Sequence, residues 1–187
     1  MPEPRGNPVR ITTCVDANLM HDLVTGRSLT GILMMINQTP VEWYSKKQAT
    51  VETATFGSEF IAARIATEHI MDIRYTLRMI GVPLDGPAWM FGDNEGVKKN
   101  CTVPHSMLKK RRNALAYHRV REAIAAKIVR FAHIPSIINI DDILTKPLRV
   151  DTFQRLVTPV LFRLPPLPIE EEPPVMIESD NTTPITT

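Results

Sequence analysis

The chain has 187 residues, of which 43% are hydrophobic and 22% are charged, and its net charge is +2. This composition is ordinary for a globular protein and too apolar for a fully disordered one. The sequence has no apolar run near the roughly 18 residues of a membrane span, and MPEPRGNPVR at its start lacks the apolar segment of a secretory signal. Two cysteines are too few for a disulfide framework. We therefore expect an intracellular protein, cytoplasmic or nuclear, that does not bind membranes.

The charged residues are unevenly distributed along the chain. Five of the 20 acids lie in residues 164–187, which contain no Lys or Arg, so residues 1–163 hold 15 acids against all 22 basic residues. This acidic segment is also rich in proline, and we expect it to be a disordered tail. Residues 1–8, rich in Pro, Gly and charge, are expected to be a flexible lead-in. The basic part between them favours a polyanionic partner.

Three strands are predicted near the start of the chain. The β-branched run VRITTCV (9–15) indicates a strand that ends at Asp16, and GILMMINQ (31–38) and VEWYSKK (41–47) indicate two more. Pro40 is placed in the turn between them, because proline cannot donate a hydrogen bond to a sheet. The short links predict an antiparallel meander.

Helices and strands alternate in the rest of the chain. Apolar residues at spacings of three to five predict a long helix from about 53 to 80, stopped by Gly81 and Pro83. The pattern then predicts a strand over 88–94, a short helix over 94–100 and a longer helix over 114–128. A strand over 129–134 and a last helix over 142–157, interrupted near Pro147, complete the series. This order indicates an α/β domain over residues 9–160. It would contain a five-stranded mixed sheet, a meander of three strands plus two parallel strands, with flanking helices.

Four acids occupy positions that suggest a shared site. Asp16 and Asp93 each follow an apolar strand, at the edge where α/β sheets place ligands, and they would be adjacent if their strands were parallel neighbours. Glu59 lies in the first turns of the long helix, and Asp142 opens the last one. Clustered carboxylates repel one another unless a cation neutralises them. Oxygen ligands select Mg²⁺ or Mn²⁺, and paired ions of this kind serve phosphoryl transfer.

Each of these residues also has an ordinary structural interpretation. Asp16 and Asp93 suit turns at strand ends, Glu59 suits a solvated helix position, and Asp142 suits a helix N-cap. Aromatic residues in the strands, and His69 and Tyr75 on the long helix, are expected to serve packing; the strand residues are Trp43, Tyr44 and Trp89. Spacing alone leaves both interpretations of the acids open.

A series of motifs adds a resemblance to a known family. VDAN, WYSKKQATVETATFGSEFIAA, FGDN and DDILTKPL occur in this order, and the chain resembles the RNase H domain of copia-type (LTR) retrotransposon Pol polyproteins over roughly residues 9–150. The resemblance implies the RNase H fold and an active site in which four acids hold two Mg²⁺ ions, with Mn²⁺ possible. The implied catalytic and metal-binding residues are Asp16, Glu59, Asp93 and Asp142. The family usually has Ala before the last aspartate, which makes Asp141 an expected N-cap or solvated neighbour.

The chain also departs from the family pattern. Gly57 stands where the family often has Glu, Asn18 stands where it usually has Asp, and only Tyr117 and His118 remain of its His-x-Asp-x-Arg-Tyr-His block. No Tyr-x-Asp-Asp polymerase motif occurs in the sequence. We therefore expect a stand-alone piece of such a polyprotein: a truncated element, a gene-model fragment or a domesticated remnant.

The resemblance implies a metal-dependent endoribonuclease that cleaves the RNA strand of RNA–DNA hybrids, with Glu59 reading the 2′-hydroxyl. Its partners would be the hybrid and possibly a reverse transcriptase domain, within a virus-like particle if the element is active. His133, nine residues before Asp142, is a candidate proton shuttle or a packed or exposed strand residue. Candidate phosphate contacts, each alternatively a solvated charge, are Lys46, Lys47, Lys98, Lys99, Lys109, Lys110, Arg111 and Arg112.

Two alternatives to this function remain. The chain could be a non-catalytic retroelement remnant that retains the fold and binds nucleic acid. It could also be another nuclease of the same fold, such as an integrase or an exonuclease, although the SKKQ and DDILTKPL blocks argue against this.

Overall fold

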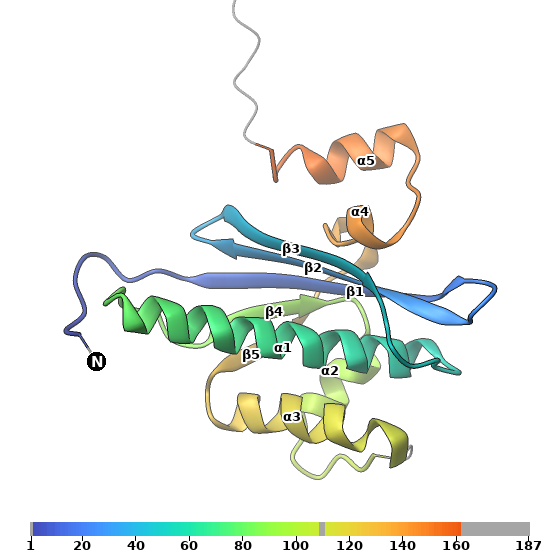
Figure 1. Cartoon of the computed structure of the whole chain (residues 1–187), viewed down its shortest axis with the longest axis horizontal. Coiled ribbons are helices and arrows are strands. Elements are labelled where there is room, and N and C mark those ends of the chain that lie inside the picture. Colours follow the sequence, from blue (N-terminus) through green and yellow to red (C-terminus); the bar gives the residue numbers. More distant parts are fainter. Residues whose placement is uncertain (1, 109–110, 162–187) are drawn as a thin grey trace, which may run out of the picture.

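The structure is a computed structural model that describes residues 2–108 and 111–161. Five strands form one mixed sheet, and helices lie on both of its faces (Figure 1). The elements are β1 (Ile11–Asp22), β2 (Arg27–Ile36), β3 (Thr39–Lys47), α1 (Thr55–Met79), β4 (Ala88–Gly92), α2 (Glu95–Thr102), α3 (Ala114–Ala125), β5 (Val129–His133), α4 (Asp142–Thr145) and α5 (Val150–Val157). Two 3-10 turns, η1 (Arg111–Asn113) and η2 (Ser136–Ile138), precede α3 and α4. Residues 164–187, the predicted tail, lie outside the described part.

The sheet has the strand order β3-β2-β1-β4-β5. β2 pairs antiparallel with both β1 and β3, whereas β4 pairs parallel with β1 and β5. Antiparallel neighbours need only short turns, and each parallel neighbour is reached through a helical crossover. The predicted mixed sheet, with its meander of three strands and its parallel pair, is therefore confirmed.

β1 is longer than the sequence suggested. We expected it to end at Asp16, but it continues to Asp22 and pairs with β2 at Ala17, Asn18 and Asp22. The pairing is interrupted between Asn18 and Asp22, where Met20 adopts a φ of 51°. Residues beyond Asp16 have no β-branched run, so their extended conformation depends on hydrogen bonds to β2, which a local pattern does not reveal.

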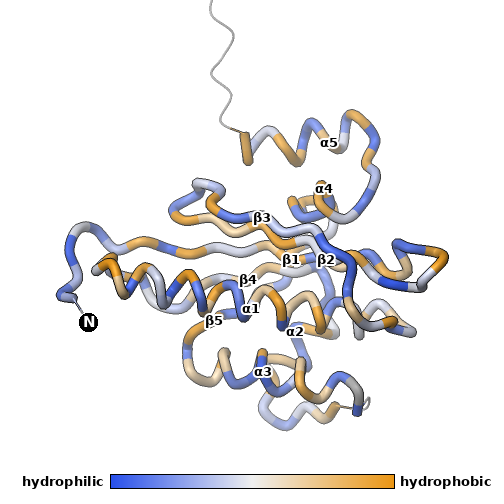
Figure 2. The backbone as a smooth tube through the Cα atoms, in the orientation of Figure 1, coloured by the Kyte–Doolittle hydropathy of each residue, from blue (hydrophilic) through white to orange (hydrophobic). Residues whose placement is uncertain are grey.

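The core lies between the sheet and α1. Figure 1 shows α1, α2 and α3 on one face of the sheet. α1 presents Phe60, Ala63, Ala66 and Ile70, all buried, and the small alanines let the helix approach the strands closely. Complete burial of a side chain such as Phe60 contributes about 1.5–3 kcal/mol. Apolar residues run along the strands and this helix (Figure 2).

The expected core role of the strand aromatic residues is wrong for Trp43, and Tyr75, expected to be structural, is also exposed. Trp43 on the edge strand β3 is 69% exposed, and Tyr75 on α1 is 60% exposed. Trp89 is half-buried, stacks on Phe91 and has the Arg130 guanidinium 4.8 Å above its ring. An edge strand has one face and one side open to solvent, so an aromatic residue on it is not buried by strand membership alone.

The predicted last helix is two helices, α4 and α5, separated at Pro147. The residue before a proline avoids helical dihedrals, and Lys146 is accordingly extended, with φ −131° and ψ 144°. α4 packs against β1, β2 and β3, on the side of the sheet opposite α1 (Figure 1). This break fixes where the last acids of the chain meet the sheet.

In the described part, no helix combines the length and the apolar character that a membrane crossing requires.

Candidate metal centre

Three of the four predicted acids converge at one edge of the sheet. Cys14 of β1 is paired with Phe91 of β4, so the residues two positions further along, Asp16 and Asp93, are neighbours. Glu59, in the second turn of α1, reaches the same place. One carboxylate oxygen from each of these three residues lies within 4.8 Å of the others. They line an open pocket of about 500 Å³.

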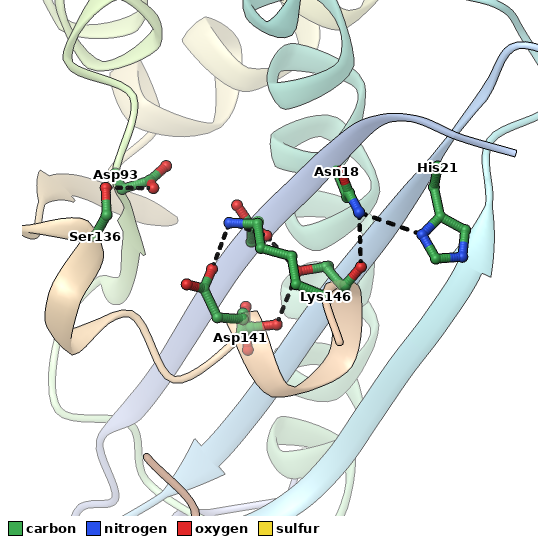
Figure 3. A network of polar contacts seen from close by, with 9 residues as sticks. Asn18, His21, Asp93, Ser136, Asp141 and Lys146 are labelled. Carbon is green, nitrogen blue, oxygen red and sulfur yellow. Dashed lines mark hydrogen bonds and ion pairs between the residues drawn. The ribbon is translucent and has the colours of Figure 1, made fainter. Parts of the chain in front are cut away.

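Asp16 is held in place by α4. Its side chain is 1% exposed, and its Oδ2 accepts a hydrogen bond from the Thr145 hydroxyl. The Lys146 ammonium lies 3.3 Å from the same oxygen. Asn18 connects β1 to α4 a second time, because its amide donates to the Thr145 carbonyl at 3.0 Å (Figure 3). A carboxylate at position 18 could not make this bond, which accounts for the asparagine physically.

Glu59 and Asp93 complete the cluster from the other side. Burial raises the pKa of Glu59 well above its usual value, and the charges of Asp16 and Asp93 raise it further. Asp93 is oriented by Ser136, whose hydroxyl donates to Oδ2 at 2.8 Å (Figure 3). His133 lies 3.0 Å from the Asp93 carbonyl, and because a carbonyl only accepts, its Nε2 donates. The cluster is therefore preformed, and repulsion between its carboxylates contributes to the raised pKa of Glu59.

Asp142, the fourth predicted acid, lies beside this group. It begins α4, and its Oδ1 is 2.7 Å from the Lys146 ammonium. Burial raises the pKa of Asp142 and the charges of Asp16 and Asp93 add to this, although Lys146 opposes them. The charges of the cluster thus affect the pKa of Asp142, but the Asp142 oxygens do not belong to the group of oxygens that lie within 4.8 Å of one another. Its role as a metal ligand stays a prediction.

Asp141 differs from its expected role. It occupies the position before α4, but its side chain makes no capping hydrogen bond, and it is completely buried rather than solvated. Neither of its carboxylate oxygens has a hydrogen bond of normal geometry. Burial raises the pKa of Asp141 well above its usual value, the charges of Asp16 and Asp142 add to this, and the Leu33 backbone N–H opposes it. Asp141 therefore faces the sheet, whereas Asp142 contacts the lysine of the pocket.

The donor set of this site fits a hard divalent cation. Asp16, Glu59 and Asp93 offer only carboxylate oxygens, which are the ligands that Mg²⁺ and Mn²⁺ prefer. Burial first, and then the charges of Asp16 and Asp93, raise the pKa of Glu59, and Lys146 is the one cationic side chain among the residues that line the pocket in the described part. A divalent cation would remove this imbalance.

Three supporting residues of the site were not predicted. Thr145 and Lys146 contact Asp16, and Ser136 orients Asp93. Thr145 and Lys146 lie three and four residues after Asp142, the spacing that brings helix residues to one face, so the DDILTKPL motif already contained this signal. No local pattern marks Ser136, because it meets Asp93 only through the fold.

The predicted phosphate contacts lie on two sides of the pocket. Lys46 and Lys47 end β3 and line a groove of about 820 Å³ beside α1, and Lys47 also pairs with Asp22 at 2.8 Å. Lys98 and Lys99 lie on α2, whose first residue lines the acidic pocket. Arg111 is exposed in η1. Lys109, Lys110 and the side chain of Arg112 lie outside the described residues, so their predicted role is untested.

Comparison with known proteins agrees with this architecture. No protein-family model matches the chain. Two retrovirus-related Pol polyproteins of Arabidopsis thaliana, from transposons RE1 and RE2, are each 27% identical over 165 residues, which is 87% of this chain and 11% of each relative. The chain thus spans about a tenth of the length of these curated relatives.

Solved RNase H structures share the fold. LC11-RNase H1, isolated from compost by a metagenomic approach, superposes with a TM-score of 0.56 at 15% identity, covering 73% of this chain and 92% of that one. Its complex with RNA/DNA hybrid gives the same TM-score at 16% identity, covering 73% and 94%. RNase H1 from the halophilic archaeon Halobacterium salinarum NRC-1 gives 0.54 at 17% identity, covering 73% and 94%. The chain is a homologue of the retrovirus-related Pol polyproteins of transposons, and its fold is the RNase H fold.

Proposed function

We propose that this protein is a metal-dependent endoribonuclease that cleaves the RNA strand of RNA–DNA hybrids and derives from a copia-type retrotransposon Pol polyprotein. The observation that carries the proposal is the convergence of Asp16, Glu59 and Asp93 at the sheet edge, with oxygens within 4.8 Å of one another. The relatives and the RNase H fold support it, and one structural neighbour is a complex with RNA/DNA hybrid. A reverse transcriptase domain of a longer polyprotein is the proposed protein partner.

Four residues would hold two Mg²⁺ ions, with Mn²⁺ as a substitute: Asp16, Glu59, Asp93 and Asp142. Such ions favour ionisation of an attacking water and stabilise negative charge on the departing oxygen. In the hydrolysis, the water oxygen bonds to phosphorus, the bond from phosphorus to the 3′-oxygen breaks, and that oxygen gains a proton. The products are a 3′-hydroxyl and a 5′-phosphate.

The chain's own residues would orient the reacting groups. Thr145 fixes Asp16 and Ser136 fixes Asp93 by the hydrogen bonds described above, and preorganised groups of this kind avoid reorganisation during reaction. Because Nε2 of His133 donates to the Asp93 carbonyl, its Nδ1 is the atom left to take up a proton in the neutral ring. We propose His133 as the proton shuttle and Glu59 as the reader of the RNA 2′-hydroxyl.

The test is cleavage of a labelled RNA–DNA hybrid in Mg²⁺ by the wild type and by Asp93→Asn. The variant keeps the shape of the side chain but removes one of the clustered charges, so we expect cleavage to fall by at least about a thousandfold. Asp85→Asn is the matched control, because Asp85 is exposed and pairs with Arg10 at 2.7 Å, away from the pocket. Equal activity of Asp93→Asn and wild type, with Mg²⁺ required in both, would refute the assignment.

The alternative function is that of a non-catalytic remnant that binds nucleic acid. One observation favours it: Lys146 already lies within ion-pair distance of Asp16 and Asp142, so these carboxylates do not need added cations to coexist. The same assay separates the two functions when hybrid binding is measured alongside cleavage. Mg²⁺-independent binding without any cleavage by the folded wild type indicates the remnant.

A further inference from the structure

We propose that Lys146 is an exchangeable cation of the acidic pocket: it neutralises Asp16 and Asp142 while no divalent ion is bound, and it contacts the phosphodiester of the substrate once such ions have taken its place. The second half of this proposal rests on the nuclease function proposed above. The first half concerns only the free protein and cations.

The contacts of Lys146 carry the first half. Its ammonium lies 2.7 Å from Asp142 Oδ1 and 3.3 Å from Asp16 Oδ2, so it bridges an acid that begins α4 and an acid of β1 (Figure 3). Asp16 is 1% exposed, and its charge cannot be compensated by bulk water. The Lys146 ammonium thus lies between the carboxylate of Asp16 and that of Asp142, the fourth predicted ligand.

The position of Lys146 in the pocket makes the exchange physically reasonable. The side chain is 34% exposed, more than Asp142 at 15%, so its charged end can move towards solvent, as long lysine side chains do. Pro147 keeps the Lys146 backbone extended, outside the regular part of α4, so its displacement leaves the helix intact. A lysine that only locked α4 to the sheet would not need to line the open pocket.

The same position carries the second half. Among the described residues that line the pocket, Lys146 is the one with a cationic side chain, and the others near the cluster are acidic or neutral. Once a divalent cation neutralises Asp16 and Asp142, the ammonium loses its partners and faces the place where a phosphate would lie. Lysine binds phosphate as a compact point charge, which suits this change of partner.

Cation binding by the free protein tests the first half without any reference to activity. We expect Lys146→Met to bind Mn²⁺ about tenfold more tightly than the wild type in calorimetric titration, because a single and a double positive charge a few Å apart repel even in water. Arg10→Met is the matched control, since it also removes one cation from a 2.7 Å ion pair, but just before the start of β1. Unchanged or weaker Mn²⁺ binding by Lys146→Met would overturn the proposal.

Thermal unfolding separates exchange from a purely structural role. In EDTA we expect Lys146→Met to melt below the wild type, because Asp16 loses its counter-ion, and in saturating Mn²⁺ we expect the difference to vanish. The Arg10→Met difference should be the same in both conditions. A Lys146→Met penalty that is equal in EDTA and in Mn²⁺ means that the lysine is only a structural lock, and it contradicts the proposal.

Steady-state cleavage of the hybrid in saturating Mn²⁺ tests the contact with phosphate. Lys146→Met should raise KM about tenfold, and Lys146→Arg should restore most of it, because an arginine also binds phosphate. An unchanged KM refutes the second half. If the wild type cleaves nothing, the nuclease function fails and the second half with it, whereas the titration and unfolding experiments still decide the first half.

Discussion

Asp141 shows at the residue scale that a motif can place a carboxyl group where the fold buries it without a hydrogen bond of normal geometry. Its neighbour Asp142 contacts Lys146 at the pocket, whereas Asp141 is completely buried and lacks a hydrogen bond of normal geometry. Burial of an unpaired polar group costs about 1–3 kcal/mol. The same burial raises the pKa of Asp141 well above its usual value, so this carboxyl resists ionisation more than an exposed aspartate does.

We expect Asp141→Ala to increase the free energy of unfolding by about 1–3 kcal/mol, with a larger increase at about pH 8 than at about pH 5. The pKa of Asp141 is higher in the folded state than in the unfolded state. The free energy of unfolding of the wild type therefore falls as pH rises from the unfolded-state pKa through the folded-state pKa. The variant does not have this pH-dependent penalty. Urea unfolding at both pH values measures the difference.

Asp151→Ala is the control for this experiment, because Asp151 is an exposed aspartate of α5 and its removal should change stability little at either pH. A gain for Asp141→Ala that does not depend on pH would contradict the raised pKa of Asp141.

At the element scale, the contact between α4 and β2 builds the site. Gly31 is the partner of Asp16 in the β1–β2 register, and α4 lies directly over it. A Cβ at position 31 would lie 2.5 Å from Thr145 Cγ2 and 3.2 Å from the Asp141 carbonyl oxygen. The missing side chain therefore lets Thr145 reach Asp16. The lack of a side chain at Gly57 on α1 also prevents a collision, since a Cβ there would lie 2.2 Å from a carboxylate oxygen of the buried Glu52.

We expect Gly31→Ala to destabilise the protein by about 1–3 kcal/mol and to abolish hybrid cleavage, because the new methyl group forces α4 away from β1. Guanidinium unfolding and the cleavage assay measure the two effects.

Thr145→Ser provides a specific rescue of this variant. Serine lacks the Cγ2 atom that collides with residue 31 but keeps the hydroxyl that donates to Asp16. The double variant Gly31→Ala/Thr145→Ser should therefore recover part of the stability and activity of the wild type. If it recovers neither, the collision with Thr145 is not the cause of the defect.

At the scale of the whole molecule, basic residues flank an acidic pocket. Lys46 and Lys47 lie on the β3 side of the pocket and Lys98 and Lys99 on the α2 side. A duplex bound over the pocket would place phosphates near both groups. Interactions of this kind are independent of sequence and release counterions, so they weaken as salt concentration rises.

We expect Lys46→Ala/Lys98→Ala to bind an RNA–DNA hybrid more weakly and to reduce the salt dependence of the affinity, by about 0.9 in the log–log slope for each phosphate that the variant no longer neutralises. Fluorescence anisotropy across a salt series in the Asp93→Asn background measures this without cleavage. Arg10→Ala is the control, because Arg10 is exposed and precedes the first residue of β1, whereas the pocket lies further along that strand at Asp16. An unchanged slope in the double variant would show that the duplex does not lie between these two groups.

Much of the fold was predictable from local patterns. The spacing of apolar residues in the long helix predicted α1 to within two residues at each end, and Gly81 and Pro83 predicted its end, because helix periodicity and helix termination are properties of neighbouring residues. The meander and the two later strands were also predicted. The extension of β1 to Asp22 and the exposure of Trp43 were not, because both depend on which strands lie alongside.

The sequence by itself determined the identity and chain order of the acids and the motif that places Lys146 four residues after Asp142. Only the tertiary structure decided that Asp16, Glu59 and Asp93 share one pocket, that Ser136 orients Asp93, and that Asp141 faces the sheet while Asp142 faces the lysine. The physical reason is that electrostatic repulsion and hydrogen bonding act over a few Å in space. Residues separated by tens of positions reach such distances only through strand register and helix docking.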